Sequence, residues 1–446
     1  MISILVALLS MGYLADRRAR LLERPIHVNH LLASLLIFSA WAYGVVPNYL
    51  NIVSSGRGEV LTTNVRVISG TAQVMGQLFL LLTAACAVAL LINTMSRPST
   101  LHYPAIMLLL LPFILLSISS ITNAGGYSIY SLVYPLVVIA LWRAQVGLSV
   151  LATVGWLTVF LAIASLALGL INKEIGTAPA PIEGGKVIWD SLLAGPHSHP
   201  NVLGLALSLG LPFVPLIKQL PVKVVGTALI AVALVWSGNR NSIFAGGAVL
   251  LIWLLISCTR RKKWVILPII IGTAMTIMTP ILSNNAADFS FRGRIWNASL
   301  LRAHESPLFG LGPRFYQLIA RFRNELGQTA FSGHNAYVHT VTTGGIATTL
   351  AVVLLLTLIA KRSIESTSSD FVPALFITGL IFNSWLQNPG TYSGLDVMSY
   401  AFFIPMAILL FQPQTNPRLT ADGGKETPEG LSSRNRPRHT FDYSRT

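Results

Sequence analysis

The chain has 446 residues, of which 53% are hydrophobic and only 11% are charged, and its formal net charge is +15. Soluble domains carry about 25% charged residues, so the composition excludes a soluble domain and indicates an all-α polytopic integral membrane protein. The apolar runs are continuous over roughly 17–25 residues. This length fits membrane-spanning helices and not barrel strands, which alternate over about ten residues.

In chain order the sequence predicts about thirteen spans, with about twelve as the alternative. The predicted spans cover residues 1–15, 29–50, 67–93, 103–121, 126–142, 146–171, 201–217, 222–237, 241–257, 264–282, 338–360, 371–388 and 396–412. Together they form a single transmembrane domain over residues 1–412, into which residues 283–337 are inserted as one large loop. Residues 413–446 are predicted to be a disordered basic tail, because they are rich in Pro, Gly, Ser, Arg and Thr.

Lysines and arginines gather in alternate connections, such as the blocks Arg17–Arg24 and Arg260–Lys263. Under the positive-inside rule these connections are cytoplasmic, which puts the tail inside and the N-terminus outside. The loops 172–200, 283–337 and 389–395 then face the extracytoplasmic side of the cytoplasmic membrane. The positive-inside rule accounts for most of the lysines and arginines, so the net positive charge does not imply a nucleic-acid partner. Membrane lipids are expected partners.

The large loop is expected to contain two short helices. Residues 313–326 place apolar side chains at helical spacing, which predicts an amphipathic helix that lies on the membrane surface. Residues 291–303 form the other predicted helix, with Asp288 or Ser290 as its cap. The turn between the two helices is assigned to Pro307, Gly310, Gly312 and Pro313.

The large loop has a surplus of arginine. It holds six arginines against three acids. The arginines are Arg292, Arg294, Arg302, Arg314, Arg321 and Arg323. Three carboxylates cannot pair six guanidinium groups, and a guanidinium donates hydrogen bonds in pairs to phosphate. The loop is therefore predicted to bind an anion, with contact to lipid headgroups as the alternative.

Three other sites stand out. Arg240 lies at a boundary between two spans. A charge at this position is expected to pair with another group or to have a function. The alternative is that its side chain only extends to the membrane interface by snorkelling. His334 lies at the mouth of a span and is suited to proton transfer, with a structural role as the alternative. His197 and His199 lie on either side of Ser198, and a proline precedes and follows this group. The two prolines favour a rigid turn, and a metal site is the less favoured interpretation.

Neither a cofactor nor a metal is expected. The external loops lack a close pair of carboxylates, so a divalent cation on a pyrophosphate would have few ligands. The two cysteines, Cys86 and Cys258, form no spacing motif. There is no P-loop and no serine-nucleophile signature.

Several segments resemble a known superfamily. They are Phe291-Arg-Gly-Arg-Ile-Trp, Ser306-Pro-Leu-Phe-Gly-Leu-Gly, Gly333-His-Asn-Ala-Tyr, Thr343-Gly-Gly-Ile, His199-Pro-Asn-Val-Leu-Gly and Ser237-Gly-Asn-Arg-Asn-Ser. Over about residues 196–350 the chain resembles the O-antigen ligase and O-antigen polymerase superfamily. The earlier residues match only as apolar spans, and the pattern does not separate ligase from polymerase.

The resemblance implies transfer of a glycan from undecaprenyl pyrophosphate to a lipid or glycan acceptor outside the cytoplasm, without metal and with inversion. By position, Arg240, Arg294 and His334 match the catalytic residues, although Arg292 stands two residues from Arg294. Other residues are expected to bind or orient the substrate. These are Arg292, Arg314, Asn335, Tyr337, His199, Asn201 and Asp396.

The expected chemistry agrees with this resemblance. Guanidinium groups would stabilise the charge that grows on a leaving pyrophosphate. His334 would act on the acceptor hydroxyl as a base or as a positioning group. A ligase is the first hypothesis and a repeat-unit polymerase the alternative. A transporter or flippase of a lipid-linked anion is the alternative of another class, although the chain shows neither a clear repeat nor midplane charges.

Overall fold

The computed structural model describes residues 28–57, 68–95, 103–123, 128–179, 190–259, 261, 263–283, 285–322, 332–367 and 370–412. The chain divides into a compact unit, Met1–Gln412, and a tail, Pro413–Thr446. The tail lies outside the described residues, as do the predicted span 1–15 and Arg323. The disorder and sidedness of the tail stay predictions.

The fold is helical, and within the described residues eight helices are long and apolar enough to cross a membrane. They are α2 (Val28–Ser55), α4 (Gly70–Thr94), α5 (Tyr103–Thr122), α7 (Ala152–Ile171, preceded by the 3₁₀ turn Leu148–Leu151), α10 (Leu220–Ser237), α11 (Arg240–Thr259), α12 (Lys263–Leu282) and α15 (Ala336–Ser366). Each coincides with a predicted span. The all-α polytopic membrane fold is therefore confirmed.

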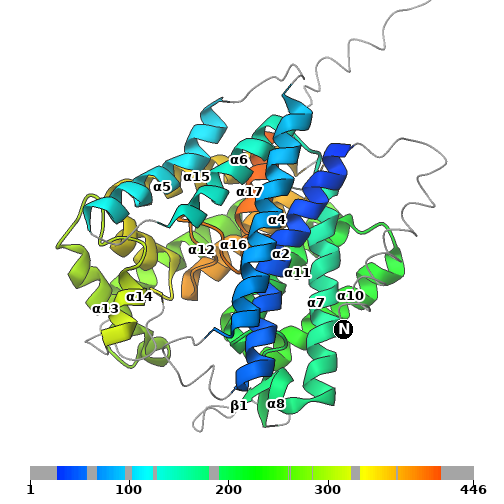
Figure 1. Ribbon diagram of the computed structural model, residues 1–446, viewed down its shortest axis with the longest axis horizontal. Helices are drawn as coiled ribbons and strands as arrows, with labels where there is room; N and C mark the ends of the chain where they lie inside the picture. The colour runs from blue at the N-terminus through cyan, green and yellow to red at the C-terminus, as the bar shows by residue number, and fades with distance from the viewer. Residues whose placement is uncertain are drawn as a thin grey trace, which may run out of the picture. The chain divides into compact units, whose positions relative to one another are not determined.

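Four other predicted spans contain shorter apolar helices. They are α6 (Val133–Ala144, after the 3₁₀ turn Ile129–Leu132), α9 (Pro200–Gly210, continued by the 3₁₀ turn Leu211–Leu216), α16 (Val372–Leu386) and α17 (Phe403–Phe411). Every residue of α17 and nearly every residue of α16 is buried. Helices that are apolar on all sides belong in an interior, and α16 and α17 lie among the longer helices (Figure 1).

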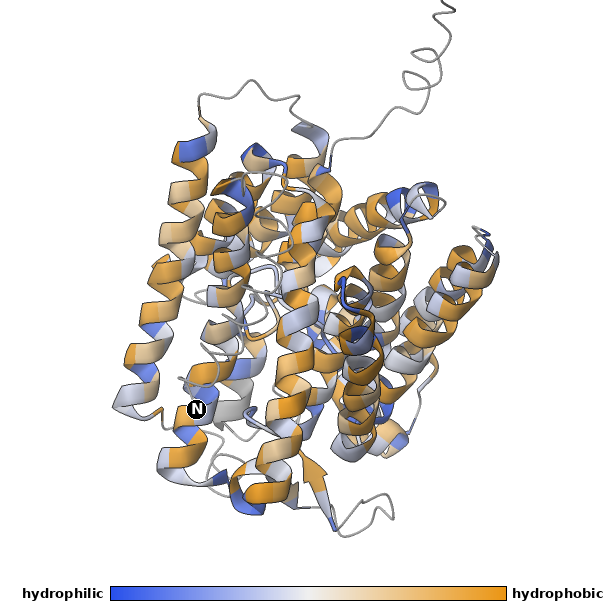
Figure 2. Cartoon of the chain, turned by 90° about the vertical axis from the view of Figure 1, so that its right-hand side faces the viewer, coloured by the Kyte–Doolittle hydropathy of each residue, from blue (hydrophilic) through white to orange (hydrophobic). Residues whose placement is uncertain are grey.

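The longer helices present apolar side chains outward, for example Leu81 on α4 and Ile270 on α12. Figure 2 shows the hydrophobic residues along the helices and hydrophilic residues gathered toward their ends. Since hydrocarbon is as apolar as these side chains, this surface suits a bilayer. The described residues also include a two-stranded antiparallel sheet, β1 (Thr177–Pro179) and β2 (Ser191–Leu193), which follows the short helix α8 (Lys173–Gly176). In this sheet Thr177 pairs with Leu193.

The prediction that residues 396–412 form a helical span is wrong over its first half. Helix α17 begins only at Phe403, and the preceding residues form turns that fold back among the helices, where Tyr400 and Phe402 are buried. Irregular backbone is stable at this depth only if protein groups satisfy it. Asp396 does so, because its carboxylate accepts hydrogen bonds from the backbone nitrogens of Thr391 (2.8 Å) and Met398 (2.9 Å).

Helix α15 is interrupted by a loop. Gly345 has φ 66° and ψ −169°, a conformation that is open only to glycine. The turn predicted around Pro307 and Gly310 fills this break. The nitrogens of Leu311 and Gly312 donate to the carbonyls of Thr342 and Thr343, at 2.8 and 2.9 Å.

The second half of α15 is bonded to the same loop. The nitrogens of Ile346 and Ala347 donate to the carbonyls of Pro307 and Leu308, at 2.9 and 3.1 Å. The sequence predicted an unbroken span here. Residues 306–312 and 342–347 therefore form one unit, which ties the large loop to the helix that begins after His334.

The two predicted loop helices are present with different ends. Helix α13 spans Asp288–Ala303, and α14 spans Phe315–Phe322; residues 323–331 lie outside the described residues. The predicted cap of the first helix is wrong. Ala287 occupies that position without a side-chain bond, and Asp288 instead accepts hydrogen bonds from Ser283 Oγ and the Asn285 nitrogen.

Candidate functional site

Arg240 is held by a turn whose neighbouring side chains are buried. The Asn239 amide donates to the Asn201 carbonyl (3.0 Å) and to Ser242 Oγ (2.8 Å). The Asn241 amide donates to the Asn383 carbonyl of α16, at 3.0 Å. These bonds fix the start of α11 against α9 and α16, while Arg240 itself stays exposed.

Arg292 follows a strained stretch of backbone. Phe289, Ser290 and Phe291 all have positive φ, at 52°, 60° and 66°. The left-handed region costs a non-glycine residue on the order of 1 kcal/mol, and such strain often occurs at functional sites. Gly293 passes so near the Asn285 carbonyl that a β-carbon would lie 2.2 Å from it. The geometry of the first residues of α13 therefore determines where Arg292 lies.

Arg292, Arg240 and His199 form one cationic site. Burial first, and then the Arg240 charge, lowers the pKa of Arg292 to about 10. Burial first, and then the charges of Arg57 and Arg292, lowers the pKa of His199. Such influence requires proximity, so three segments distant in sequence meet here. Among the described residues, no group forms a hydrogen bond or ion pair with the Arg240 or Arg292 side chain.

His334 lies at the start of α15 and is tied to the same helix as Arg292. Its φ is 46°, and its backbone nitrogen donates to Ser332 Oγ at 3.2 Å. Trp296 Nε1 donates to the carbonyl of Gly333 at 3.0 Å. Since Trp296 stands four residues after Arg292, the two side chains share one face of α13. The backbone next to His334 is thereby tied to the helix that carries Arg292.

Asn335 serves the fold. Its side chain is fully buried, accepts from the Val338 nitrogen (3.0 Å), and donates to the carbonyls of Thr276 (2.8 Å) and Trp385 (2.7 Å). Both amide hydrogens are thus used to join α15 to α12 and α16. This geometry gives Asn335 a positioning role in the fold, and its contact with substrate stays a prediction.

The remaining predicted residues are spread more widely. Arg294 and Arg314 are exposed, and Arg294 faces away from Arg292 because two helical residues differ by about 200° in direction. Asp396 was predicted to bind or orient the substrate, and its carboxylate accepts hydrogen bonds within its own loop, from Thr391, Met398 and Ser399. Asn201 contributes its backbone to the turn at Arg240.

Residues 225–354 match the family model described as O-Antigen ligase. Over this segment the chain is similar to the O-antigen ligase family. The superfamily predicted from the sequence is thereby confirmed, and its members are membrane glycosyltransferases of the ligase or polymerase type. The match includes Arg240, Arg292 and His334 and leaves out His199. No curated protein and no solved structure matches the chain.

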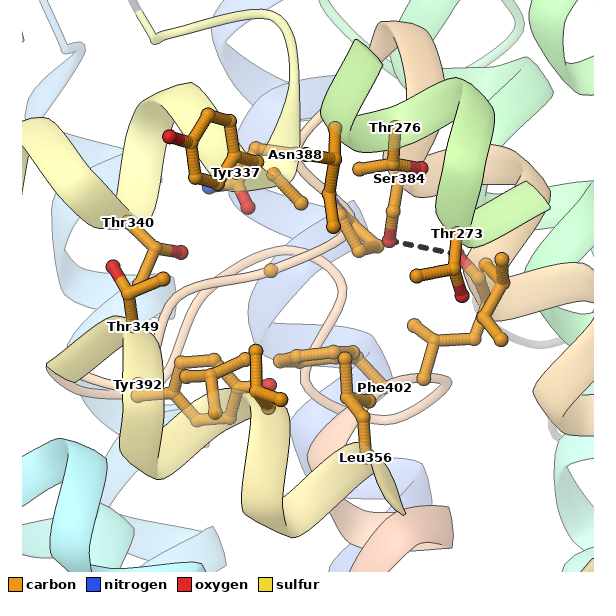
Figure 3. Close-up of a pocket in the computed structure, with 18 residues that line it drawn as sticks. Thr273, Thr276, Tyr337, Thr340, Thr349, Leu356, Ser384, Asn388, Tyr392 and Phe402 are labelled. Atoms are coloured by element: carbon orange, nitrogen blue, oxygen red, sulfur yellow. Dashed lines mark hydrogen bonds between the residues drawn. The ribbon is translucent and has the colours of Figure 1, made fainter. Parts of the chain in front are cut away.

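A cavity of about 110 Å³ lies beside the start of α15 and is lined by residues inside and outside the matched segment. Thr273, Thr276, Tyr337, Thr349 and Ser384 are among its lining residues (Figure 3). Three of the lining hydroxyls, on Thr276, Thr349 and Ser384, donate to carbonyls of their own helices, at 2.8 Å each. The cavity walls are therefore largely apolar, and Tyr337 is one of the lining residues.

Arg57 was not among the predicted site residues, and its charge acts on His199. It follows α2 and is 4% exposed. The sequence did hold a signal for it, because in the predicted topology Arg57 lies in an extracytoplasmic connection, against the positive-inside rule.

The structure also places Tyr316 of α14 beside this site. Its hydroxyl donates to Ser299 Oγ at 3.0 Å, and its ring stacks on His339 with centroids 5.2 Å apart. Helix α14 is therefore packed against α13 and α15. Within the described ranges no three His, Cys, Asp or Glu residues come together; independence from metal stays a prediction.

Proposed function

We propose that the protein transfers a glycan from undecaprenyl pyrophosphate to an acceptor hydroxyl, as a ligase on the outer face of the cytoplasmic membrane. The observation that carries the proposal is the cationic site of Arg240, Arg292 and His199 inside and beside the segment that matches the O-antigen ligase family. Two repelling guanidinium groups are stabilised when an anion lies between them. A pyrophosphate has the charge and the paired oxygens that arginine prefers.

Arg240 and Arg292 would stabilise the charge that develops on the pyrophosphate as the glycosidic bond breaks. Removing one preorganised donor of this kind typically costs about 10²–10³-fold in rate. Burial of Arg292 lowers the local dielectric, which strengthens its interaction with the leaving group. A pKa of about 10 still leaves this guanidinium protonated at neutral pH. Arg294 and Arg314 are exposed on the same loop. We propose that they attract the negatively charged pyrophosphate of the lipid donor as it enters the site.

His334 is proposed to accept the proton of the acceptor hydroxyl as the new glycosidic bond forms. The attack occurs opposite the leaving pyrophosphate, which gives inversion at the anomeric carbon. Trp296 and Asn335 keep the histidine in place through Gly333 and through the cap of α15. The apolar cavity beside Tyr337 would receive part of the polyprenyl chain.

The test is a transfer assay with purified full-length protein, a lipid-linked oligosaccharide, candidate acceptors and EDTA. Wild type is expected to form product, and Arg292→Ala, Arg240→Ala and His334→Ala are expected to lose it. Arg302→Ala is the matched control, because Arg302 lies on the same helix but pairs with Glu305 at 2.8 Å. Equal loss in Arg302→Ala would contradict a specific role for Arg292.

The length of the product separates two reactions of the same superfamily. A single added glycan indicates ligation, and a ladder of repeats indicates polymerisation. The break in α15 is the one feature that favours a transporter or flippase, since broken helices line transport sites. The backbone groups at this break are bonded to residues 307–312 and so are not available to a transported ion, which argues against a transporter. Movement of the lipid-linked glycan across vesicle membranes without covalent transfer would support the transporter hypothesis.

A further inference from the structure

Arg57 is bonded to backbone carbonyls from two segments. Nε and Nη2 donate to the Ile175 carbonyl, with 3.0 Å for Nε, and Nη2 also donates to the Gly195 carbonyl at 2.6 Å. Nη1 donates to the His197 carbonyl at 2.7 Å and to the Ser198 carbonyl at 3.4 Å. The end of α2 lies beside α8 and β1 in Figure 1.

These carbonyls belong to the segment that leads directly to His199. A buried guanidinium without a carboxylate partner is costly unless its donors are satisfied, and here backbone oxygens satisfy them. The arrangement ties residues 195–198 to the end of α2 and to α8. Arg57 therefore determines where the next residue, His199, lies.

The hydrogen bond at His199 determines which ring nitrogen carries the proton. His199 Nδ1 accepts from the Asn201 nitrogen at 3.0 Å and so caps α9. A nitrogen that accepts this bond has no hydrogen, so the neutral ring carries its proton on Nε2. Protonation of Nδ1 would place two donors against each other and break the cap.

The charged groups around His199 oppose its protonation as well. Arg57 lies on the side of α2 and Arg292 on the side of α13, and both, after burial, lower the pKa of His199. Arg240, at the start of α11, lies next to Arg292. Among the described residues, both charges that act on His199 are positive. A neutral ring with an Nε2–H donor is therefore the form this environment stabilises.

We propose that Arg57 is a positioning residue that holds His199 as a neutral Nε2–H donor to an oxygen of the substrate anion bound by Arg292. His199 then binds the substrate and takes no part in proton transfer. The inference rests on the proposed function. It concerns residues 57 and 199, which lie outside the matched residues 225–354.

The decisive measurement is the tautomer of His199 by NMR of full-length protein with ¹⁵N-labelled histidine, assigned with His199→Gln. At pH 7 wild type is expected to carry the proton on Nε2 alone. Arg57→Gln is expected to show a mixture of the two neutral tautomers at this pH, because the loss of the bonds to the carbonyls of residues 175, 195, 197 and 198 releases the segment that holds the cap. Arg143→Gln is the matched control, because Arg143 also donates to backbone carbonyls, at Thr94 (3.0 Å) and Met95 (3.1 Å). It is expected to leave the His199 signal unchanged.

The transfer assay gives a second readout. Arg57→Gln is expected to lose about 10–100-fold at pH 7, the usual effect of an outer-shell partner. A purely structural role predicts the same loss without a change in the tautomer of His199. Arg57→Lys keeps the charge with fewer donors, so its ring should stay neutral, and it decides the matter if Arg57→Gln does not fold.

Two results would overturn the inference. One is a wild-type His199 that carries its proton on Nδ1, or is doubly protonated, at pH 7. The other is an unchanged His199 signal in folded Arg57→Gln. Both NMR results are obtained without substrate. A wild type that transfers no glycan would therefore contradict the proposed function while the tautomer still decides this inference.

Discussion

Gly310 and Gly345 are packed backbone against backbone. A β-carbon on Gly310 would lie 2.5 Å from the Gly345 nitrogen, and one on Gly345 would lie 2.6 Å from the Gly310 nitrogen. The turn of the large loop thus fills the break in α15. This contact explains why glycines stand in both Ser306–Gly312 and Thr343–Ile346, since a side chain would keep the two backbones apart. It also holds the large loop against α15.

We expect Gly310→Ala to destabilise the protein by more than about 2 kcal/mol. Gly310 has φ 71°, which costs alanine roughly 1 kcal/mol, and overpacking adds about 1–3 kcal/mol. Thermal unfolding in detergent measures the effect. The control is Gly247→Ala on α11, where a β-carbon meets nothing within 4 Å; this change should be neutral or slightly stabilising. Equal melting temperatures for the two variants would refute the contact.

Trp296→Phe should weaken transfer by about tenfold while the protein stays folded. The substitution removes the donor to the Gly333 carbonyl and leaves a buried acceptor unpaired, at a cost of about 1–3 kcal/mol. His334 then loses a constraint on its position. Transfer rates at saturating substrate measure the change. Trp253→Phe on α11 is the control, and a rate in Trp296→Phe equal to that control would remove the proposed link to His334.

Arg292→Lys should recover only part of the activity that Arg292→Ala loses. Lysine restores the charge but not the paired donors of guanidinium. We expect about 10²-fold loss for alanine and a smaller loss for lysine. Full activity of the lysine variant would contradict bidentate binding of phosphate. A competition experiment with inorganic pyrophosphate tests the same point through affinity, independently of glycan transfer.

His197 should make the protein less stable in acid. Its ring is fully buried, and burial, followed by the Arg57 charge, lowers its pKa to about 3. Between the ordinary value near 6.5 and about 3, the unfolded chain binds a proton that the folded protein does not. Stability is therefore complete above about pH 6.5 and falls as the pH drops, by up to about 1.4 kcal/mol per unit.

The substitution His197→Phe removes this titration and keeps a ring in the buried site. Neither ring nitrogen of His197 forms a hydrogen bond in the described part of the chain, so phenylalanine leaves no polar group unpaired. We expect a flatter dependence of melting temperature on pH between 6.5 and 4. His304→Phe, at an exposed position, should keep the wild-type slope. A steep slope that persists in His197→Phe would assign the acid sensitivity to other groups.

The sequence by itself determined the class of protein and most of its helices. Hydropathy over 20 residues is a local property, so spans such as Tyr103–Thr122 and Lys263–Leu282 followed from composition. It also determined that the large loop carries more arginine than acid, and that Arg240 and His334 are unusual. What it could not determine was the break at Gly345 or the turns before Phe403, because apolar composition is the same in a helix and in an enclosed irregular segment.

The tertiary structure decided which residues meet. Arg57, His199, Arg240 and Arg292 come from four separate segments, and only the packing of α2, α9, α11 and α13 brings their charges together. It brought the charges of Arg240 and Arg292 together and used both amide donors of Asn335 within the protein, in bonds to Thr276 and Trp385. Electrostatic influence and hydrogen bonding depend on distance in space, which the order of residues along a membrane protein does not contain.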